Sequence, residues 1–394
     1  MDPRAIGTAW CLGNRGGGEN DSHLRQVTCI FLYRLPQNRY LCTVRKSWII
    51  LLLTAVSCSR GYETVGGFAQ GGTYSVCYNA SPVKISRERI AREVDALLLQ
   101  IDTTLSGYNR NSQLSRLNAG DTLLLSPMFA ELYALSYDLW RCSDGVLDVA
   151  AGPLFDIWGF GFSRDSLPSP ERVSGTLASC GMHRLKAPYE LDFNVPLCAS
   201  DFLRESGGEA PRLNFNAVAQ GYSCDVIAAY LHTLGVKDML VNIGEIYLEG
   251  LNPQGRGWTV GVDTPTDGNH TPGASLSGMW QSDGGGYGVV TSGNYRKFYL
   301  HEGQKYAHTL DPRDGCPVQH SLLSATVTVR GTPEQRSATL ADAYATWFMV
   351  VGADAALEIC QTSGSSLPVP ASTETLLITA DTLLTTPGFR LLSR

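Results

Sequence analysis

One short segment of this 394-residue chain places a histidine beside a tight turn. His308 is followed by Asp311-Pro312 and Asp314-Gly315. Proline fixes φ and glycine tolerates positive φ, so these two dipeptides predict a turn between two strands. Imidazole is the usual side chain for moving protons near neutral pH, so His308 is a candidate general base. The alternative is an ordinary hairpin corner without a chemical role.

A second candidate lies further along the chain, where Asp342 and Thr346 are four residues apart in a predicted helix over 340–351. That spacing places their oxygens on one face of the helix. A carboxylate and a hydroxyl suit a hard cation such as Mg²⁺, which prefers oxygen ligands. Taken alone, such a pair is more often solvated or locally hydrogen-bonded.

Several regular elements are predicted to position these side chains. Apolar spacing, Ser or Asn caps and terminal glycines indicate helices over 86–105 (capped by Ser86), from Ser126-Pro127 to Gly145, and over 217–234 (capped by Asn216). Alternating or short apolar runs indicate strands over 67–78, 213–215, 239–243, 258–262 and 324–329.

The remaining segments carry weaker signals. Residues 145–161 are rich in glycine and aromatic residues and predict a packed loop, while 162–210 are rich in Pro, Ser and Gly and predict an excursion with short strands. The chain after 351 predicts a polar loop and then an edge strand. The irregular order of strands and helices indicates an α+β fold, in a single domain of mixed β-sheets flanked by helices.

Composition excludes several classes of protein. The formal net charge of −6 argues against non-specific nucleic-acid binding, which needs a basic surface. The eleven cysteines include no CxxC pair, which argues against zinc and iron–sulfur sites.

The N-terminal region resembles a targeting signal. Residues 44–57 combine a basic start with a short apolar run, and Cys58 follows small residues. This order is typical of a bacterial lipoprotein signal peptide, with Cys58 as the lipidated first residue of the mature protein. The run is too short for a spanning helix, which needs roughly 20 apolar residues. Residues 1–43 are then an upstream extension and 58–394 the catalytic domain; the alternative is an interior hydrophobic strand.

Seven segments, in this order, make the chain resemble the FAD:protein FMN transferase (ApbE) family. The segments are SGYNRNSQLSRLN (106–118), GVLDVAAGPLFDIWGFG (145–161), LNFNAVAQGYSCDVIAAYL (213–231), VNIGEI (241–246), TSGNYRKF (291–298), HTLDPRDGCPV (308–318) and ADAYATWFMVVG (341–352). The resemblance implies an α+β enzyme that binds FAD and Mg²⁺, transfers FMN to a Thr or Ser hydroxyl of a target protein, and releases AMP. It also implies a lipid-anchored protein on the periplasmic face of the bacterial inner membrane, with subunits of membrane redox complexes as targets.

The same resemblance implies a role for individual residues. His308 matches the proposed base, and the metal ligands match Asp342, Thr346 and the carbonyl of Ala217. The residues that match contacts to FAD are Gln70, Tyr108, Val146, Leu147, Asp148, Asn214, Gln220 and Leu310.

The chain departs from the family pattern at three places. Asn214 stands where Asp is usual, Gln220 where Lys is usual, and Glu245 replaces the second of two glycines. Glutamine can donate a hydrogen bond to a flavin carbonyl or a phosphate, but it cannot neutralise charge. Neither position 214 nor position 220 therefore supplies a charged group.

Two other functions use the same residues. Water could replace the protein acceptor, which would make the chain a Mg²⁺-dependent FAD pyrophosphatase giving FMN and AMP. A non-catalytic FAD-binding lipoprotein is the third hypothesis, although storage needs no base beside a metal. The sequence does not separate the first two, because the acceptor lies on another chain.

Overall fold

The computed structural model describes residues 10–11, 61–161, 167–267, 269, 273–295, 298–362 and 373–392. All of them belong to one compact unit, formed by residues 1–12 and 60–394. The predicted signal peptide (44–57), Cys58 and nearly all of the predicted extension (1–43) lie outside the described residues. In the part of the chain that is described, no helix combines the length and the apolar character needed to cross a membrane.

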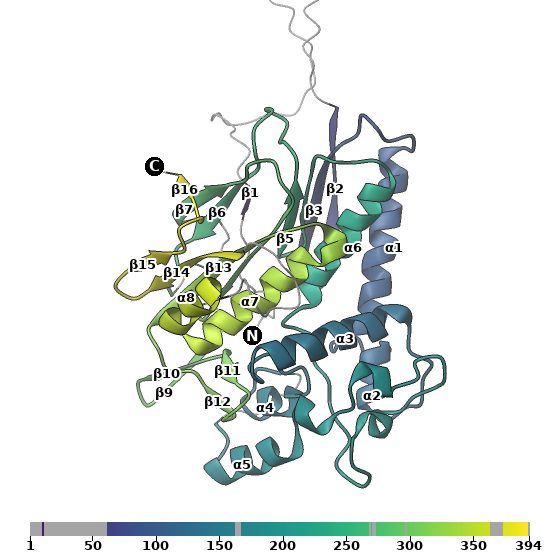
Figure 1. The fold of residues 1–394 in the computed structure, drawn as a ribbon, viewed down its shortest axis with the longest axis vertical. Coiled ribbons are helices and arrows are strands. Elements are labelled where there is room, and N and C mark those ends of the chain that lie inside the picture. Colours follow the sequence, from purple (N-terminus) through teal and green to yellow (C-terminus); the bar gives the residue numbers. More distant parts are fainter. Residues whose placement is uncertain are drawn as a thin grey trace, which may run out of the picture. The chain divides into compact units, whose positions relative to one another are not determined.

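An antiparallel sheet, which has eight strands among the described residues, forms the centre of the fold (Figure 1). Its spatial order is β15 (Leu383–Thr385), β14 (Thr373–Thr379), β13 (Leu322–Arg330), β8 (Tyr287–Gly293), β5 (Ile246–Glu249), β4 (Met239–Asn242), β3 (Gly72–Asn79) and β2 (Tyr62–Ala69). The order mixes strands from both ends of the chain, so the sheet cannot form until distant segments meet.

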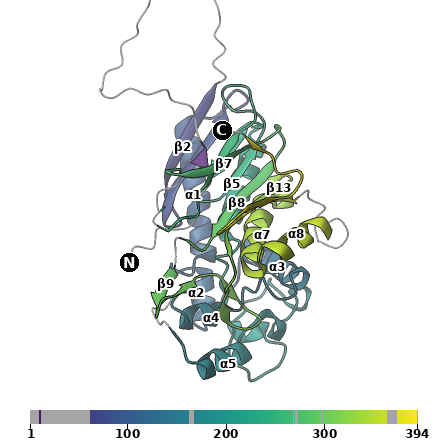
Figure 2. The same cartoon turned by 90° about the vertical axis from the view of Figure 1, so that its left-hand side faces the viewer.

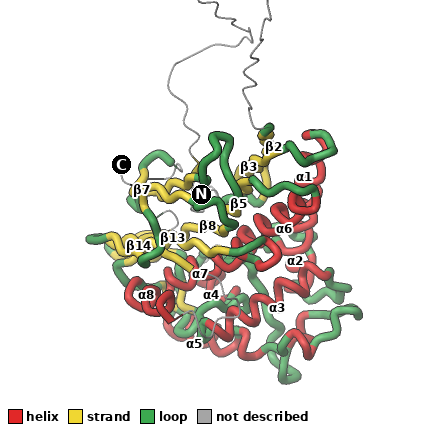
Figure 3. The backbone as a smooth tube through the Cα atoms, turned by 45° about the horizontal axis from the view of Figure 1, so that its top comes forward, coloured by secondary structure: helices red, strands yellow, loops and turns green. Residues whose placement is uncertain are grey.

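Helices cover one face of this sheet, which Figure 3 shows as a red layer beside the yellow strands. They are α1 (Arg87–Leu105), α6 (Ala219–Thr233), α7 (Ser337–Val351) and α8 (Ala353–Thr362), with the turn η4 (Pro333–Gln335) before α7. In β4, Val241 packs with the helices while its neighbour Leu240 packs on the other face, as expected from the two-residue period of a strand. Burial on both faces explains why Met239, Leu240 and Val241 are all apolar.

A second sheet packs on the opposite face. Its order is β1 (Trp10–Cys11), β6 (Thr259–Asp263), β7 (Leu276–Gln281) and β16 (Leu391–Leu392). Trp258, Val260 and Trp280 from this side form one apolar cluster with Leu248 and Val289 of the central sheet. The two sheets therefore share a core.

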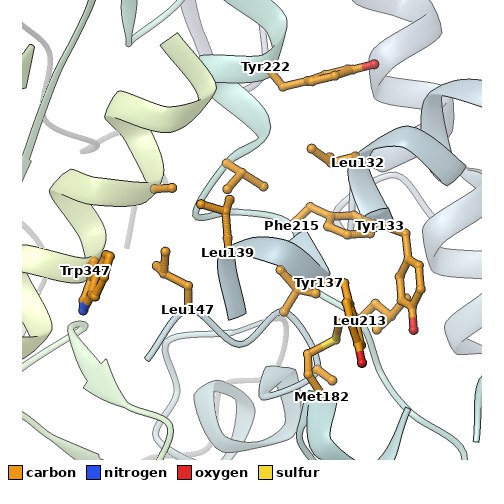
Figure 4. Close-up of a cluster of buried hydrophobic side chains, with 14 of the residues drawn as sticks. Leu132, Tyr133, Tyr137, Leu139, Leu147, Met182, Leu213, Phe215, Tyr222 and Trp347 are labelled. Carbon is orange, nitrogen blue, oxygen red and sulfur yellow. The ribbon is translucent and has the colours of Figure 1, made fainter. Parts of the chain in front are cut away.

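A helical part lies beside the lower end of the sheet in Figure 1. It contains α2 (Gln113–Asn118), α3 (Pro127–Cys142), α4 (Gly152–Ile157), α5 (Pro170–Ser179) and the short turns η1 (Met182–Arg184), η2 (Pro188–Glu190) and η3 (Ala199–Phe202). Figure 4 shows its core, where Tyr133, Phe215 and Tyr222 gather from α3, the 213–218 segment and α6. Two short hairpins, β9 (Phe298–His301) with β10 (Gln304–Ala307) and β11 (Leu310–Asp311) with β12 (Cys316–Pro317), lie next to it.

The α+β class was predicted correctly, and so were the starts of α1 and α3. The hydroxyl of Ser86 accepts a hydrogen bond from the N–H of Arg89, and Ser126 does the same for Phe129. The predicted turn also forms, because β11 and β12 pair across residues 312–315 and Gly315 has φ of 74°.

The single strand predicted over 67–78 was wrong, since it is a hairpin of β2 and β3. Its two turn residues, Gln70 and Gly71, have φ of 51° and 79°. Positive φ at both positions is the geometry of a tight two-residue hairpin. Glutamine rarely adopts it, which is why the turn was missed.

Five other predictions were wrong. The 145–161 segment contains α4, and α8 follows Gly352 where a polar loop was predicted. The described residues of the 162–210 segment form α5 and three single turns, in place of the predicted strands. Residues 213–215 form no strand, because Asn118 takes both backbone groups of Leu213 through its side chain. Asn216 does not cap a helix, since α6 begins at Ala219 after Val218 and has no side-chain cap.

A histidine at the end of α6 gives a pH-dependent contribution to stability. The two ring nitrogens of His232 lie 2.7 Å from Glu249 Oε2 and 3.0 Å from Glu334 Oε1. Only the charged imidazole donates to both carboxylates. The hydrogen bond with Glu249 is the main reason that the pKa of His232 is raised above its ordinary value of 6.5.

We expect His232→Gln to destabilise the protein most at acidic pH. A raised folded-state pKa gives stability that is fully present below the unfolded pKa and lost as pH rises through the folded one. The difference in free energy of unfolding should be roughly 0.5–1 kcal/mol near pH 6, as for partly exposed ion pairs. Denaturant unfolding of both proteins from pH 5.5 to 9 measures it, and a difference that grows with pH would contradict the assignment.

Candidate active site

The residues predicted from the sequence meet in one pocket of about 270 Å³, lined by loops of the helical part, the start of α6, the middle of α7 and the β11 hairpin. Twelve predicted residues line it: Gln70, Tyr108, Val146, Leu147, Asp148, Asn214, Ala217, Gln220, His308, Leu310, Asp342 and Thr346. Pockets that are mainly apolar, with a few convergent polar groups, are typical of small-molecule sites. The remaining predicted site residue, Cys58, is outside the described part of the chain.

His308 lies on the short link between the two small hairpins. Ala307 ends β10 and Leu310 begins β11, so each side of the histidine is held by a strand pair. Its imidazole meets the ring of Phe160 edge-on, with centroids 6.5 Å apart. The partly exposed side chain therefore faces the pocket from a fixed position and can accept a proton from a group bound there.

Asp342 lies at the place where α6 and α7 touch. Its Oδ2 accepts a hydrogen bond from the N–H of Gly221 at 3.0 Å, while Oδ1 has no hydrogen-bond partner among the described residues. Gly221 permits this contact, because a Cβ there would lie 2.3 Å from the carbonyl oxygen of Ala338. The close helix crossing thus presents one carboxylate oxygen to the pocket.

Burial strongly affects this carboxylate. It raises the pKa of Asp342 far above its ordinary value, and the negative charge of Asp225 adds to the effect. Asp225 is itself buried and accepts hydrogen bonds from Thr339 N, Thr339 Oγ1 and Ala338 N at the start of α7. An ionised Asp342 would therefore be stabilised by a cation bound in the pocket.

The oxygen donors around Asp342 suit magnesium. Thr346 lies one turn further along α7, and Ala217 lines the same pocket just before α6. Within the described ranges, no group of three or more His, Cys, Asp or Glu side chains could hold a metal. One carboxylate with neutral oxygens leaves positions for water and substrate phosphates, as Mg²⁺ usually requires.

The segment 146–149 forms an apolar wall of the pocket. Val146 and Leu147 are buried, while the carboxylate of Asp148 accepts hydrogen bonds from Ala150 N at 2.8 Å and Met182 N at 2.9 Å. Burial raises the pKa of Asp148 to about 6, and the backbone N–H groups oppose the rise. Asp148 therefore shapes this loop as well as facing the pocket.

Three side-chain amides lie near the N-terminal end of α6. Gln70 donates to Ser223 Oγ at 2.5 Å, and Gln220 donates to the carbonyl of Ile243 at 3.2 Å. Asn214 accepts from the N–H of Asn216 through Oδ1. Each amide keeps at least one further donor or acceptor for a ligand. These contacts are neutral, so the site does not need a charge at 214 or 220 to hold its shape.

Sequence reasoning missed several pocket or support residues. Phe160 and Glu245 line the pocket, and Gly221 allows the contact of α6 with α7. The motif around Phe160 was recognised, but its contact with His308 depends on folding. A glycine within the predicted helix was the available signal for Gly221, because a glycine there often marks close packing.

We expect Gly221→Ala to destabilise the protein and disturb the pocket together. The new methyl would lie 2.3 Å from Ala338 O and 2.9 Å from Asp342 Cβ, so α6 and α7 must separate. Overpacking of this kind costs roughly 1–3 kcal/mol. Denaturant unfolding measures the loss. Gly175→Ala in α5 is the matched control, because a Cβ there has nothing within 4 Å; equal stability of the two variants would contradict the close crossing.

The fold and the pocket define a class: an α+β protein whose pocket brings together the predicted flavin-contact residues, several oxygen donors and a histidine. The chain belongs to the ApbE family, whose family model matches residues 71–369. The FAD:protein FMN transferase of Vibrio cholerae serotype O1 is 27% identical over 336 residues, covering 82% of this chain and 92% of that protein.

Two further comparisons agree. The FAD:protein FMN transferase of Salmonella typhimurium is 29% identical over 306 residues, covering 75% of this chain and 81% of that protein. The apo crystal structure of Pseudomonas stutzeri flavinyl transferase ApbE matches with a TM-score of 0.66 and 31% identity, covering 82% of this chain and 94% of that one. The predicted family and fold are therefore confirmed.

Proposed function

We propose that this protein is an FAD:protein FMN transferase that moves FMN from FAD to a Thr or Ser hydroxyl of a target protein and releases AMP. The observation that carries the proposal is the meeting of His308, Asp342 and Thr346 in one pocket with the flavin-type contact residues. Flavin storage would need the contacts alone. The similarity to transferases over most of the chain supports the same activity.

The reaction needs a base, a positioned phosphate and a stabilised leaving group. The acceptor oxygen forms a bond to the phosphorus of the FMN half, and the bond between that phosphorus and the AMP oxygen breaks. His308 takes the proton of the acceptor hydroxyl, since a hydroxyl is a poor nucleophile until a neighbour accepts its proton. Phosphoryl-type transfer otherwise depends mainly on positioning and charge neutralisation.

The remaining residues hold the substrate. Val146 and Leu147 offer an apolar surface to the flavin, and the exposed ring of Tyr108 lies at the rim of the pocket. Asp342, Thr346 and the carbonyl of Ala217 would hold Mg²⁺, which when bound withdraws charge from the phosphorus and stabilises the departing AMP oxygen. The amides of Gln70, Asn214 and Gln220 can orient polar groups of FAD.

One experiment separates the transferase from its alternatives. The residues 58–394 are incubated with FAD, Mg²⁺ and a periplasmic subunit of a membrane redox complex, and products are followed by intact mass and chromatography. A mass gain of one FMN on the subunit supports transfer. FMN and AMP without labelling would indicate a pyrophosphatase, and retained FAD without turnover would indicate storage.

We also propose that Cys58 is lipidated and anchors the enzyme to the periplasmic face of the bacterial inner membrane. The basic, apolar and small-residue order of 44–58 supports this. Mass spectrometry of the native protein tests it, because a mature chain that retains Met1 would contradict both the signal peptide and the upstream extension.

A further inference from the structure

Four aromatic rings form a continuous stack beside the pocket. Trp158 stacks on Tyr306 with centroids 5.9 Å apart, Tyr306 on Tyr299 at 5.4 Å, and Tyr299 on Phe160 at 5.3 Å. The interplanar angles are 24°, 14° and 23°, so the rings are nearly parallel. We call these four residues the aromatic clamp.

The clamp joins two separate parts of the chain. Trp158 and Phe160 follow α4, while Tyr299 and Tyr306 are directly paired across the β9–β10 hairpin. The hairpin rings therefore lie between the two rings of the 158–160 segment. Figures 1 and 2 show this hairpin beside α4, at the end of the fold that carries α5.

The two ends of the 158–160 segment contact the turn that follows His308 and His308 itself. Trp158 Nε1 donates to the carbonyl of Gly315 at 2.8 Å, which ties the β11–β12 turn to the same segment. Phe160 at the other end meets the His308 ring edge-on. The two hairpins that flank His308 are thus fastened to one short piece of chain.

We propose that the aromatic clamp positions His308 for proton transfer, with Tyr306 and Tyr299 as positioning residues that act through the histidine. The link from β10 to β11 has two residues, so movement of either hairpin moves the imidazole. Trp158 and Phe160 are buried and form an apolar cluster with Leu154, Val173 and Leu310, which fixes the frame of the clamp. The proposal rests on the proposed function only for the role of His308 as base.

Stacked rings suit this task for a physical reason. Four rings with few rotatable bonds lock one another, whereas aliphatic side chains of the same volume leave several rotamers open. A misplacement of about 1 Å at a reacting group can cost roughly 10²-fold in rate. Loss of one central ring should therefore reduce turnover while leaving the FAD-binding wall in place.

The test is a double-mutant cycle between Tyr306 and His308. We expect Tyr306→Leu to lower kcat for FMN transfer roughly 10- to 100-fold with little change in the KM for FAD, and Tyr306→Phe to restore it. In a His308→Gln background, Tyr306→Leu should cost less than about twofold further, because it acts through the missing imidazole. Multiplication of the two single losses in the double variant would overturn the proposal.

A control and a second readout separate positioning from a general loss of stability. Tyr287→Leu removes a ring that meets Trp280 at 5.1 Å between the two sheets, so it should lower stability without lowering kcat. Tyr299→Leu tests the clamp independently if Tyr306→Leu folds poorly.

NMR of the histidine rings tests the positioning role of the clamp without measuring FMN transfer. If the wild type transferred no FMN, only the proposed function would be rejected. The His308 resonance, assigned by its absence from His308→Gln, should move or broaden in Tyr306→Leu and stay in place in Tyr287→Leu. An unmoved resonance in Tyr306→Leu would overturn the positioning role.

Discussion

Replacing Asp342 with asparagine should lower FMN transfer roughly 10³-fold and remove most of its response to Mg²⁺. The amide keeps the size of the side chain and can still accept the hydrogen bond from Gly221 N–H, so only the charge is lost. A bound cation contributes several kcal/mol to charge stabilisation during the reaction, and each 1.36 kcal/mol is a factor of ten in rate. Initial rates at increasing Mg²⁺ measure the effect, which high Mg²⁺ should recover only in part.

Asp354→Asn is the matched control, because it removes one charge from an exposed position on α8. It should transfer FMN at the wild-type rate. A wild-type rate and Mg²⁺ response in Asp342→Asn would show that the cation is held elsewhere.

Although Asp342→Asn should lower the transfer rate, it should raise the stability of the metal-free protein. Burial raises the folded-state pKa of Asp342. Between the ordinary pKa of 3.8 and this raised pKa, the folded state therefore binds more protons than the unfolded chain. Wild-type stability without Mg²⁺ should therefore fall as pH rises through this window, and Asp342→Asn should reduce the fall. A rate loss together with a metal-free stability gain would identify Asp342 as a site residue kept for binding.

Local signals in the sequence were sufficient for the long helices and for the turn after His308. Ser86 and Ser126 each begin a helix with the hydrogen bond that their side chains suggested, and Gly315 has the positive φ that the turn needs. These features depend on a few neighbouring residues, so a single sequence contains the required information.

The errors arose where contacts with residues distant in the sequence determine the backbone conformation. Leu213 has the pattern of a strand residue, yet its backbone groups bond to the side chain of Asn118, 95 positions away. Gln70 turns a hairpin with a backbone conformation that few glutamines adopt, and its side chain reaches Ser223 on α6. No local pattern contains either contact.

The candidate site divides in the same way. Residues with distinctive chemistry, such as His308 and Asp342, were found from their types and from the family resemblance. Gly221 and Phe160, which contribute through packing, were not found. The role of Gly221 depends on the contact of α6 with α7, and that of Phe160 on the contact of its segment with the β9–β10 hairpin. The sequence thus indicated the candidate reacting groups, and the structure revealed the residues that hold them in place.

His308→Gln separates proton transfer from binding. We expect it to slow FMN transfer by roughly 10²–10⁴-fold, the usual contribution of general-base catalysis, and to leave FAD affinity nearly unchanged. Glutamine can still form hydrogen bonds but cannot accept the acceptor's proton. Since Asp342 and Thr346 remain, the variant should keep its Mg²⁺ response, in contrast to Asp342→Asn.

Three measurements make this prediction decisive. Single-turnover transfer rates report the chemical step, titration with FAD reports binding, and a pH series should lose the dependence that an imidazole base contributes. His301→Gln is the matched control, because His301 is exposed at the end of β9, a short distance along the chain from His308. If His308→Gln transferred FMN at the rate of this control, the base would have to be another group, and the clamp would have no catalytic purpose.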